Sequence, residues 1–373
     1  MNDIINQEEN AKIFKSFLKN SKDKEGKKIN YIIEAYKNKL GFGSDGTIYE
    51  VKCQGSNRIL AAKLISNIND KKEKRLKMIQ ELKGPNIIRI ESLLSKEINK
   101  EKYAMIIMEK AVLRDLGKLN YSYFYHNLLK LLYEPFEEHL GDNLLRFYCK
   151  QIIESLELLN RNNYVHFDIK PENILITLTL IVKLSDFSLL AKLTDEDTKI
   201  PGGTPGYVSR EYYDKQKISK ENLKKQDYFS LGSTIFFLKY GENMLDYDKY
   251  SDALMTKDRI TDLLTKRIEY IKSRPFADND FIDFLLSLIQ YNPDERPIFE
   301  QIYRNKWLNK NLDIIKSVTS GNEADEEKLI MELQKSDFLK SKQNEIKEKI
   351  ITHKKFRFKI KKRKNIFEFN SGK

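Results

Sequence analysis

The chain has 373 residues, of which 40% are hydrophobic, so it is long enough to bury a substantial core. Its formal net charge of +12 belongs mainly to the C-terminal end, because residues 340–373 contain 13 Lys or Arg and only 3 Glu. Two distant cysteines argue against a disulfide framework or a zinc site, and no apolar run approaches the roughly 20 residues of a transmembrane helix. We therefore expect a monomeric intracellular protein, in the cytoplasm or, if the basic end acts as an import address, in the nucleus.

The first part of the chain has the residue pattern of a small β-rich unit. Residues 1–30 form an N-terminal extension with apolar residues at near-helical spacing. Over residues 31–109, β-type segments are separated by Gly-rich and polar turns, and residues 69–83 have the periodicity of an amphipathic helix. This pattern predicts a small lobe of five antiparallel strands and one helix.

After the small lobe the apolar periodicity becomes helical, which predicts a larger, mainly α-helical lobe over residues 110–308. Within it, residues 117–141 are rich in aromatic side chains and are expected to form an extended segment. Residues 309–373 form a tail in which an acidic helix precedes a basic segment. The predicted fold class is therefore α+β, with two lobes in one domain over residues 31–308. Long helices are expected at about 143–163, 222–240, 257–272 and 279–290.

A glycine-rich turn lies between the first two predicted strands of the small lobe. Its G-x-G-x-x-G pattern fits a hairpin that folds its main chain over nucleotide phosphates, whereas a dinucleotide-binding loop would open a helix. An ordinary glycine-rich turn is the alternative for such a triplet taken alone. Lys63, on the third predicted strand, lies among small apolar residues, from which its ammonium group can reach phosphate oxygens. The residues expected around a nucleotide in this turn are Leu40, Gly41, Phe42, Gly43, Ser44, Asp45, Gly46, Thr47 and Ile48.

Two later motifs carry a family resemblance. Residues 165–173 read VHFDIKPEN and residues 183–187 read KLSDF, which resemble, in order and spacing, the catalytic loop and the metal-binding motif of eukaryotic protein kinases. The resemblance covers roughly residues 33–307. It implies a Ser/Thr protein kinase that transfers the γ-phosphoryl group of Mg-ATP to hydroxyl groups of a protein substrate. The composition, heavy in Lys, Asn and Ile, is similar to that of kinases from unicellular eukaryotes such as ciliates.

The resemblance also implies a role for each matching polar residue. Asp168 would orient the substrate hydroxyl and accept its proton, and Lys170 would lie near the transferring phosphoryl group, as in Ser/Thr-directed members. Asn173 and Asp186 would hold Mg²⁺, a hard cation that prefers oxygen ligands. Lys63 would bind the α- and β-phosphates of ATP. Taken alone, each of these acids and amides would more often be a turn or cap residue.

Further positions follow from the same resemblance. The strand that ends at Met108 would lead into the hinge, with Met108 as gatekeeper and the main chain of Glu109 and Ala111 at the adenine edge. Thr204, in the substrate-docking end of the activation segment, is expected to hydrogen-bond near Asp168 and Lys170. Two structural roles are also implied: an ion pair between Glu211 and Arg296, and a brace of the catalytic loop by Asp227.

The chain departs from the family pattern at several positions. Phe167 replaces the usual Arg before the catalytic Asp, so phosphorylation of the activation loop, at Thr194 or Thr198 for example, is not expected to be the on-switch. Ser188 replaces a Gly, and Ser209-Arg210 replaces Ala-Pro. The position expected to hold the glutamate partner of Lys63 is Arg75, which leaves Glu73 or Glu81 as candidates. These departures keep open an alternative function, a pseudokinase-like scaffold that uses the fold and the tail for protein interactions.

The basic segment of the tail leaves its partner open. Residues 353–364 alternate basic and apolar side chains and then become a basic run. Such a segment can bind an acidic protein, an anionic lipid surface or nucleic acid, and a solvated extension is the simpler alternative.

Overall fold

The computed structural model describes two lobes and the segments that join them. The predicted extended segment 117–141, the tail beyond residue 310, and Ser44, Asp45 and Thr198 lie outside the described residues. The partner of the tail therefore stays a prediction. The described residues are 13–14, 16–17, 21–22, 28–29, 31–32, 39–43, 46–53, 58–111, 115–116, 142–177, 181–194, 199–214, 217–245, 257–273 and 278–310.

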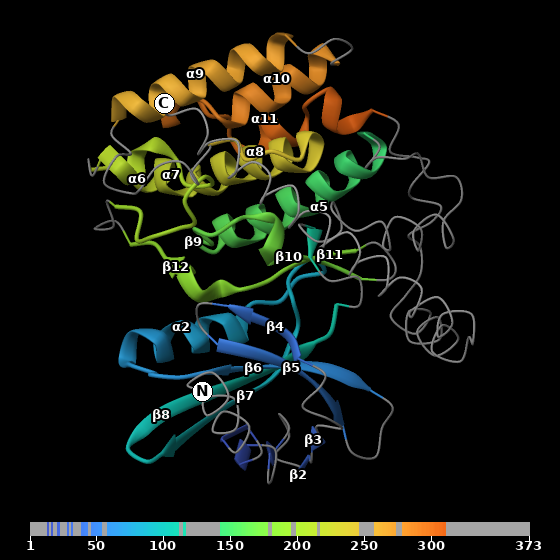
Figure 1. The fold of residues 1–373 in the computed structure, drawn as a ribbon, viewed down its shortest axis with the longest axis vertical. Coiled ribbons are helices and arrows are strands. Elements are labelled where there is room, and N and C mark those ends of the chain that lie inside the picture. Colours follow the sequence, from blue (N-terminus) through green and yellow to red (C-terminus); the bar gives the residue numbers. More distant parts are fainter. Residues whose placement is uncertain are drawn as a thin grey trace, which may run out of the picture.

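The small lobe is an antiparallel sheet with one helix, as predicted (Figure 1). The sheet order is β3-β5-β6-β8-β7, and β4 pairs with residues 46–49 of β5. The five expected strands are present, and the two-residue strand β3 is an addition at one edge. The elements of this lobe are β3 (Tyr31–Ile32), β4 (Lys39–Gly43), β5 (Gly46–Cys53), β6 (Ile59–Ile65), α2 (Asp70–Glu81), β7 (Ile90–Ile98) and β8 (Glu101–Glu109), with a separate pair β1 (Ser21–Lys22) and β2 (Lys28–Ile29) before them.

Both faces of this sheet are covered. Alternate side chains of β6 point to opposite faces, so one set packs toward α2 and the other packs toward residues of the N-terminal extension. Phe14 of that extension is fully buried, and its ring meets that of Tyr49 edge to face, with 4.8 Å between the centroids. The face that carries Ala61 and Ile65 also carries Lys63, which turns this side chain toward the space between the lobes.

The large lobe is mainly helical, as predicted (Figure 1). Helix α8 lies at its centre and is buried over almost its whole length, which fits its continuous run of apolar and small residues. It ends at Gly241, whose left-handed φ of 70° and N–H bond to Phe237 form a glycine cap. The helices are α5 (Asp142–Arg161), α6 (Arg210–Asp214), α7 (Lys220–Lys224), α8 (Gln226–Tyr240), α9 (Lys257–Ser273), α10 (Asn279–Leu288) and α11 (Phe299–Tyr303). Among the described residues, no helix is long and apolar enough to cross a membrane.

Two short strand pairs on the side of the large lobe that faces the small lobe hold the polar motifs (Figure 1). Strand β9 (Tyr164–Val165) pairs with β12 (Ala191–Lys192), and β10 (Ile174–Ile176) pairs with β11 (Val182–Leu184). The segment after α2 crosses onto this layer, where Asn86 accepts from the N–H of Leu184 at 2.8 Å and donates through Nδ2 to Gln151 of α5, also at 2.8 Å. The motifs at both ends of these strands are thus held against the small lobe.

Candidate active site

The loop after β9 is held by a buried carboxylate. Asp227, in the first turn of α8, accepts from the main-chain N–H groups of His166 at 2.8 Å and of Phe167 at 2.9 Å. Burial raises the pKa of Asp227 to about 7, although both N–H bonds act to lower it. Phe167 has a left-handed φ of 65°, an unfavourable backbone conformation for a residue with a Cβ, and the bonds to Asp227 hold it there. The expected brace of the catalytic loop by Asp227 is confirmed.

Asp168, the next residue, lies at the centre of a group of hydrogen-bond donors. Thr204 donates to Oδ1 at 2.5 Å, while Lys170 Nζ and Asn173 Nδ2 each lie 2.9 Å from Oδ2. Lys170 also donates to the hydroxyl of Thr204 at 2.6 Å, so Thr204 lies beside both Asp168 and Lys170, as expected. Asp168 is 7% exposed, so its carboxylate is buried among donors that fix its orientation. This arrangement suits a base that accepts a proton from one positioned hydroxyl.

Lys63 and Asp186 meet across the space between the lobes. Lys63 Nζ lies 2.8 Å from Asp186 Oδ1, although the two residues are 123 positions apart in the sequence. Burial acts to raise the pKa of Asp186, but the charge and hydrogen bond of Lys63 hold it below its ordinary value. Asp186 has a left-handed φ of 57° and precedes the one-turn helix η2 (Phe187–Leu189). A carboxylate kept ionised in this way is a suitable ligand for a divalent cation.

Asn173 is linked to the second motif through Ser185, the residue directly before Asp186. Ser185 donates to the main-chain oxygen of Asn173 from both its N–H and its hydroxyl, each at 2.9 Å. Since Nδ2 of Asn173 is bonded to Asp168, its amide oxygen is the atom that could ligate a cation. Two oxygen ligands from the chain fit Mg²⁺, which binds to few protein groups and keeps other positions for waters and phosphate oxygens.

The glycine turn is the hairpin between β4 and β5. Gly43 pairs with Gly46, Phe42 with Thr47 and Gly41 with Ile48. A Cβ at Gly46 would lie 1.8 Å from the main-chain oxygen of Leu64, and its φ is +146°, so only glycine fits there. Leu40 of β4 and Ile48 of β5 are partly buried against the main core.

The predicted hinge leaves the end of β8. Met108 is buried in the core, and Glu109 accepts from Lys183 at 3.1 Å and from the N–H of Arg89 at 2.7 Å. The N–H of Glu109 itself donates to the oxygen of Arg89 at 3.0 Å, so a contact of Glu109 with adenine would use its carbonyl group. Ala111 is the last described residue of this connector before residue 115.

Neither glutamate considered as a partner for Lys63 reaches it. Glu73 instead forms an ion pair with Lys102 of β8 and a 3.9 Å contact with Lys77, and Glu81 is exposed at the end of α2. Arg75, the residue at the expected glutamate position, donates to the main-chain oxygens of Ser188 and Leu190. Sequence reasoning missed these contacts, and the only signal for them was the basic residue itself.

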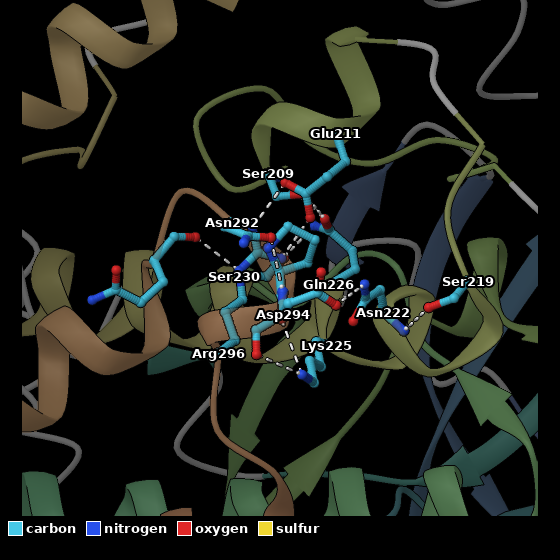
Figure 2. A network of polar contacts seen from close by, with 12 residues as sticks. Ser209, Glu211, Ser219, Asn222, Lys225, Gln226, Ser230, Asn292, Asp294 and Arg296 are labelled. Carbon is cyan, nitrogen blue, oxygen red and sulfur yellow. Dashed lines mark hydrogen bonds and ion pairs between the residues drawn. The ribbon is translucent and has the colours of Figure 1, made fainter.

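The segment around Ser209 and Glu211, which is expected to dock the substrate, is tied to the large lobe by the polar network of Figure 2. Arg296 donates to both carboxylate oxygens of Glu211, at 2.7 and 2.8 Å, and to the oxygen of Gln290 at 3.0 Å. The predicted Glu211–Arg296 pair is confirmed, and both residues are buried.

The Ser that replaces Ala in this segment has a partner of its own. Ser209 donates its hydroxyl to Oε1 of Gln226, and Gln226 donates in turn to Ser230 at 2.9 Å (Figure 2). Ser230 completes the chain by donating to the oxygen of Tyr207 at 2.8 Å. Gln226 and Ser209 are fully buried, so the departure from the family pattern is compensated by a satisfied polar network that sequence reasoning did not find.

Comparisons with known proteins agree with this geometry. The model of the protein kinase domain matches residues 35–308. Serine/threonine-protein kinase PLK4 of Drosophila virilis is 26% identical over 280 residues, which cover 73% of this chain and 32% of that protein. Aurora kinase of Schizosaccharomyces pombe is 27% identical over 281 residues, 74% of this chain and 71% of that protein. For serine/threonine-protein kinase MRCK gamma of Mus musculus the values are 27% over 212 residues, 54% of this chain and 13% of that protein.

The chain thus spans about a third of the Drosophila relative and a smaller part of the mouse relative. The family model, by contrast, covers both lobes and every motif described above. The chain belongs to the protein kinase family.

Proposed function

We propose that this protein is a serine/threonine protein kinase that transfers the γ-phosphoryl group of ATP to hydroxyl groups of a protein substrate. The observation that supports this most directly is the placement of Asp168, Lys170 and Thr204 in one hydrogen-bonded group. Lys63 and Asp186 form the second half of the site, where their opposite charges suit phosphate and metal respectively.

Each residue contributes by position and charge. Lys63 would leave Asp186 and bind the phosphates, while Asp186 and the amide oxygen of Asn173 would hold Mg²⁺. The metal ion, when bound, would neutralise the charge that develops on the phosphate oxygens. Asp168 would hold the attacking hydroxyl and accept its proton, and the positive charge of Lys170 would stabilise the transferring phosphoryl group. Asp227 would keep Asp168 in place through its hold on the two preceding N–H groups.

Specificity for Ser and Thr hydroxyls is supported by Lys170. Its Nζ lies 2.9 Å from Oδ2 of Asp168 and 2.6 Å from the hydroxyl of Thr204, so it lies where a short substrate side chain would meet Asp168. The names of the relatives above, serine/threonine-protein kinases in two cases, point the same way.

A scaffold without activity is the second candidate, and one observation favours it. Helix α2 offers no acid to Lys63 in the described structure, and Lys63 is paired with Asp186 instead. A lysine without the usual clamp is less well oriented toward phosphates, which would slow transfer.

The test is phosphate transfer from Mg-ATP to a generic Ser/Thr substrate such as myelin basic protein. The intact chain is compared with Asp168→Asn and with Asp283→Asn, which makes the same chemical change at an exposed position of α10. Loss of transfer in Asp168→Asn alone, with ATP binding retained, supports the kinase. Equal background transfer by all three proteins, each folded and able to bind ATP, supports the scaffold.

A further inference from the structure

Arg75 lies in the middle of helix α2, on the side that faces the large lobe. The helix is capped at its N-terminus by Asn69, whose side chain accepts from the N–H of Lys72 at 2.9 Å. Leu76 and Ile79 bury the apolar face of the helix in the main core. Together with Lys63 and Asp186, Arg75 lines a cavity of about 70 Å³ between α2, β8 and the segment after Asp186. The position of this side chain is therefore set by the packing of the helix.

Two main-chain carbonyl groups of the large lobe receive the guanidinium group of Arg75. Its Nε donates to the oxygen of Leu190 at 2.9 Å, and its Nη1 donates to the oxygen of Ser188. These two carbonyl groups belong to the turn η2 and to the residue that follows it. Leu190 closes that turn with an N–H bond to Phe187 at 3.2 Å. A guanidinium group suits this role because its N–H groups form a rigid planar fork that stays charged at every physiological pH.

The turn held by Arg75 begins directly after Asp186. Asp186 has a left-handed φ of 57°, a backbone conformation that is unfavourable for most L-residues and persists where the surrounding structure holds it. Ser188, which replaces the glycine of the family pattern, lies within the turn and has less backbone freedom than glycine would have there. Bonds from α2 to the middle of this turn and to the residue that follows it therefore limit where the carboxylate of Asp186 can lie.

No other residue among those described supplies this connection from α2. Lys63 is bonded to Asp186 and not to an acid of the helix, and Glu73 is engaged with Lys102 on the strand β8. Lys72 donates to the oxygen of Ser66, within the small lobe. The direct polar link between helix α2 and the metal-binding motif thus runs through Arg75.

We propose, on the basis of the kinase function proposed above, that Arg75 is a positioning residue. It ties helix α2 to the turn after Asp186 and so fixes the carboxylate that would hold Mg²⁺. In this chain the link between α2 and the site consists of a cation and two carbonyl groups, in place of an ion pair between Lys63 and a glutamate.

The test compares Arg75→Met, Arg75→Lys and the control Lys74→Met, which removes a neighbouring exposed charge from the same helix. Arg75→Met should lower kcat by about 10- to 100-fold, the loss that one or two hydrogen bonds from a charged group provide. The KM for ATP should change by less than about threefold, because Lys63 and the hinge are untouched, and the Mg²⁺ concentration for half-maximal rate should rise. Arg75→Lys should recover part of the rate, and Lys74→Met should stay within about twofold of the unmodified protein.

Amide hydrogen exchange provides a readout that does not depend on catalysis. Without nucleotide, residues 187–192 should exchange at least about fivefold faster in Arg75→Met than in the unmodified protein and in Lys74→Met. Unchanged exchange together with an unchanged kcat overturns the proposal. If the unmodified protein transfers no phosphate, the kinase function fails, while the exchange result still decides whether Arg75 holds the turn. If Arg75→Met does not fold, the comparison of Arg75→Lys with Lys74→Met decides in the same way.

Discussion

Phe167 offers a direct test of how the activation segment is held. The side chain is 1% exposed and belongs to an apolar cluster at the junction of the catalytic loop, the segment after Asp186 and the region before α8. In the family pattern an arginine stands here and meets a phosphate. The cluster consists of Val165, Phe167, Leu193, Ile200, Ile218 and Leu223.

Replacement of Phe167 by alanine should lower the free energy of unfolding by about 3–5 kcal/mol, the range for a phenylalanine removed from a packed core. That is a large part of the 5–15 kcal/mol that typically stabilises a domain. Phe167→Leu, which keeps most of the apolar volume, should cost less than about 1.5 kcal/mol. Phe167→Arg should be at least as harmful as alanine, because it buries a cation among apolar side chains.

Urea unfolding of the four proteins measures these differences. The same cluster predicts that phosphatase treatment leaves the activity of the unmodified protein within about twofold, since apolar contacts rather than a phosphate order the segment. The reasoning is refuted if Phe167→Ala unfolds at the same urea concentration as the unmodified protein. It is refuted for the activation segment if phosphatase abolishes activity that a kinase-treated sample retains.

Three further predictions concern buried groups. Burial lowers the pKa of His166, so the folded ring stays neutral while the ring in the unfolded chain takes up a proton below about pH 6.5. The free energy of unfolding should therefore decrease below that pH, by up to about 1.4 kcal/mol per pH unit more than it does in His166→Gln. Urea unfolding of both proteins at each pH measures this difference, in which the titration of Asp227, common to both, cancels. Arg296→Met leaves the Glu211 carboxylate buried without its cation and should cost about 3–5 kcal/mol, whereas adding Glu211→Leu should restore part of the loss in a double-mutant cycle. Phe14→Ala should cost about 3–5 kcal/mol in the same unfolding assay, and a change below about 1 kcal/mol would show that Phe14 does not pack on the sheet in solution.

The sequence by itself determined the parts of the fold that depend on local pattern. The strand and helix order of the small lobe and the four long helices of the large lobe follow from the periodicity of apolar residues and from the turns between them, and the structure agrees with both, whereas the short strands β9 to β12 were not predicted. The hairpin at Gly46 follows from a φ that only glycine adopts easily. Asp168, Lys170 and Asn173 could be selected together because their motif resembles the catalytic loop of protein kinases, and since they lie within six positions the loop that holds one of them holds the others nearby.

The contacts between distant segments were decided only by the tertiary structure. The partner of Lys63 depends on how α2 is rotated against the sheet and on where Asp186 lies, and neither is a property of a short segment. For the same reason the carbonyl partners of Arg75, more than 110 positions away, could not be read from the residue alone. In the sequence, Phe167 could be interpreted only as a replacement for the usual arginine. In the structure it packs into an apolar cluster of residues from several separate segments. The local sequence pattern limits which side chains can lie on the buried face of each element. Packing decides which of them are in contact, because the stability of the core depends on all its contacts together.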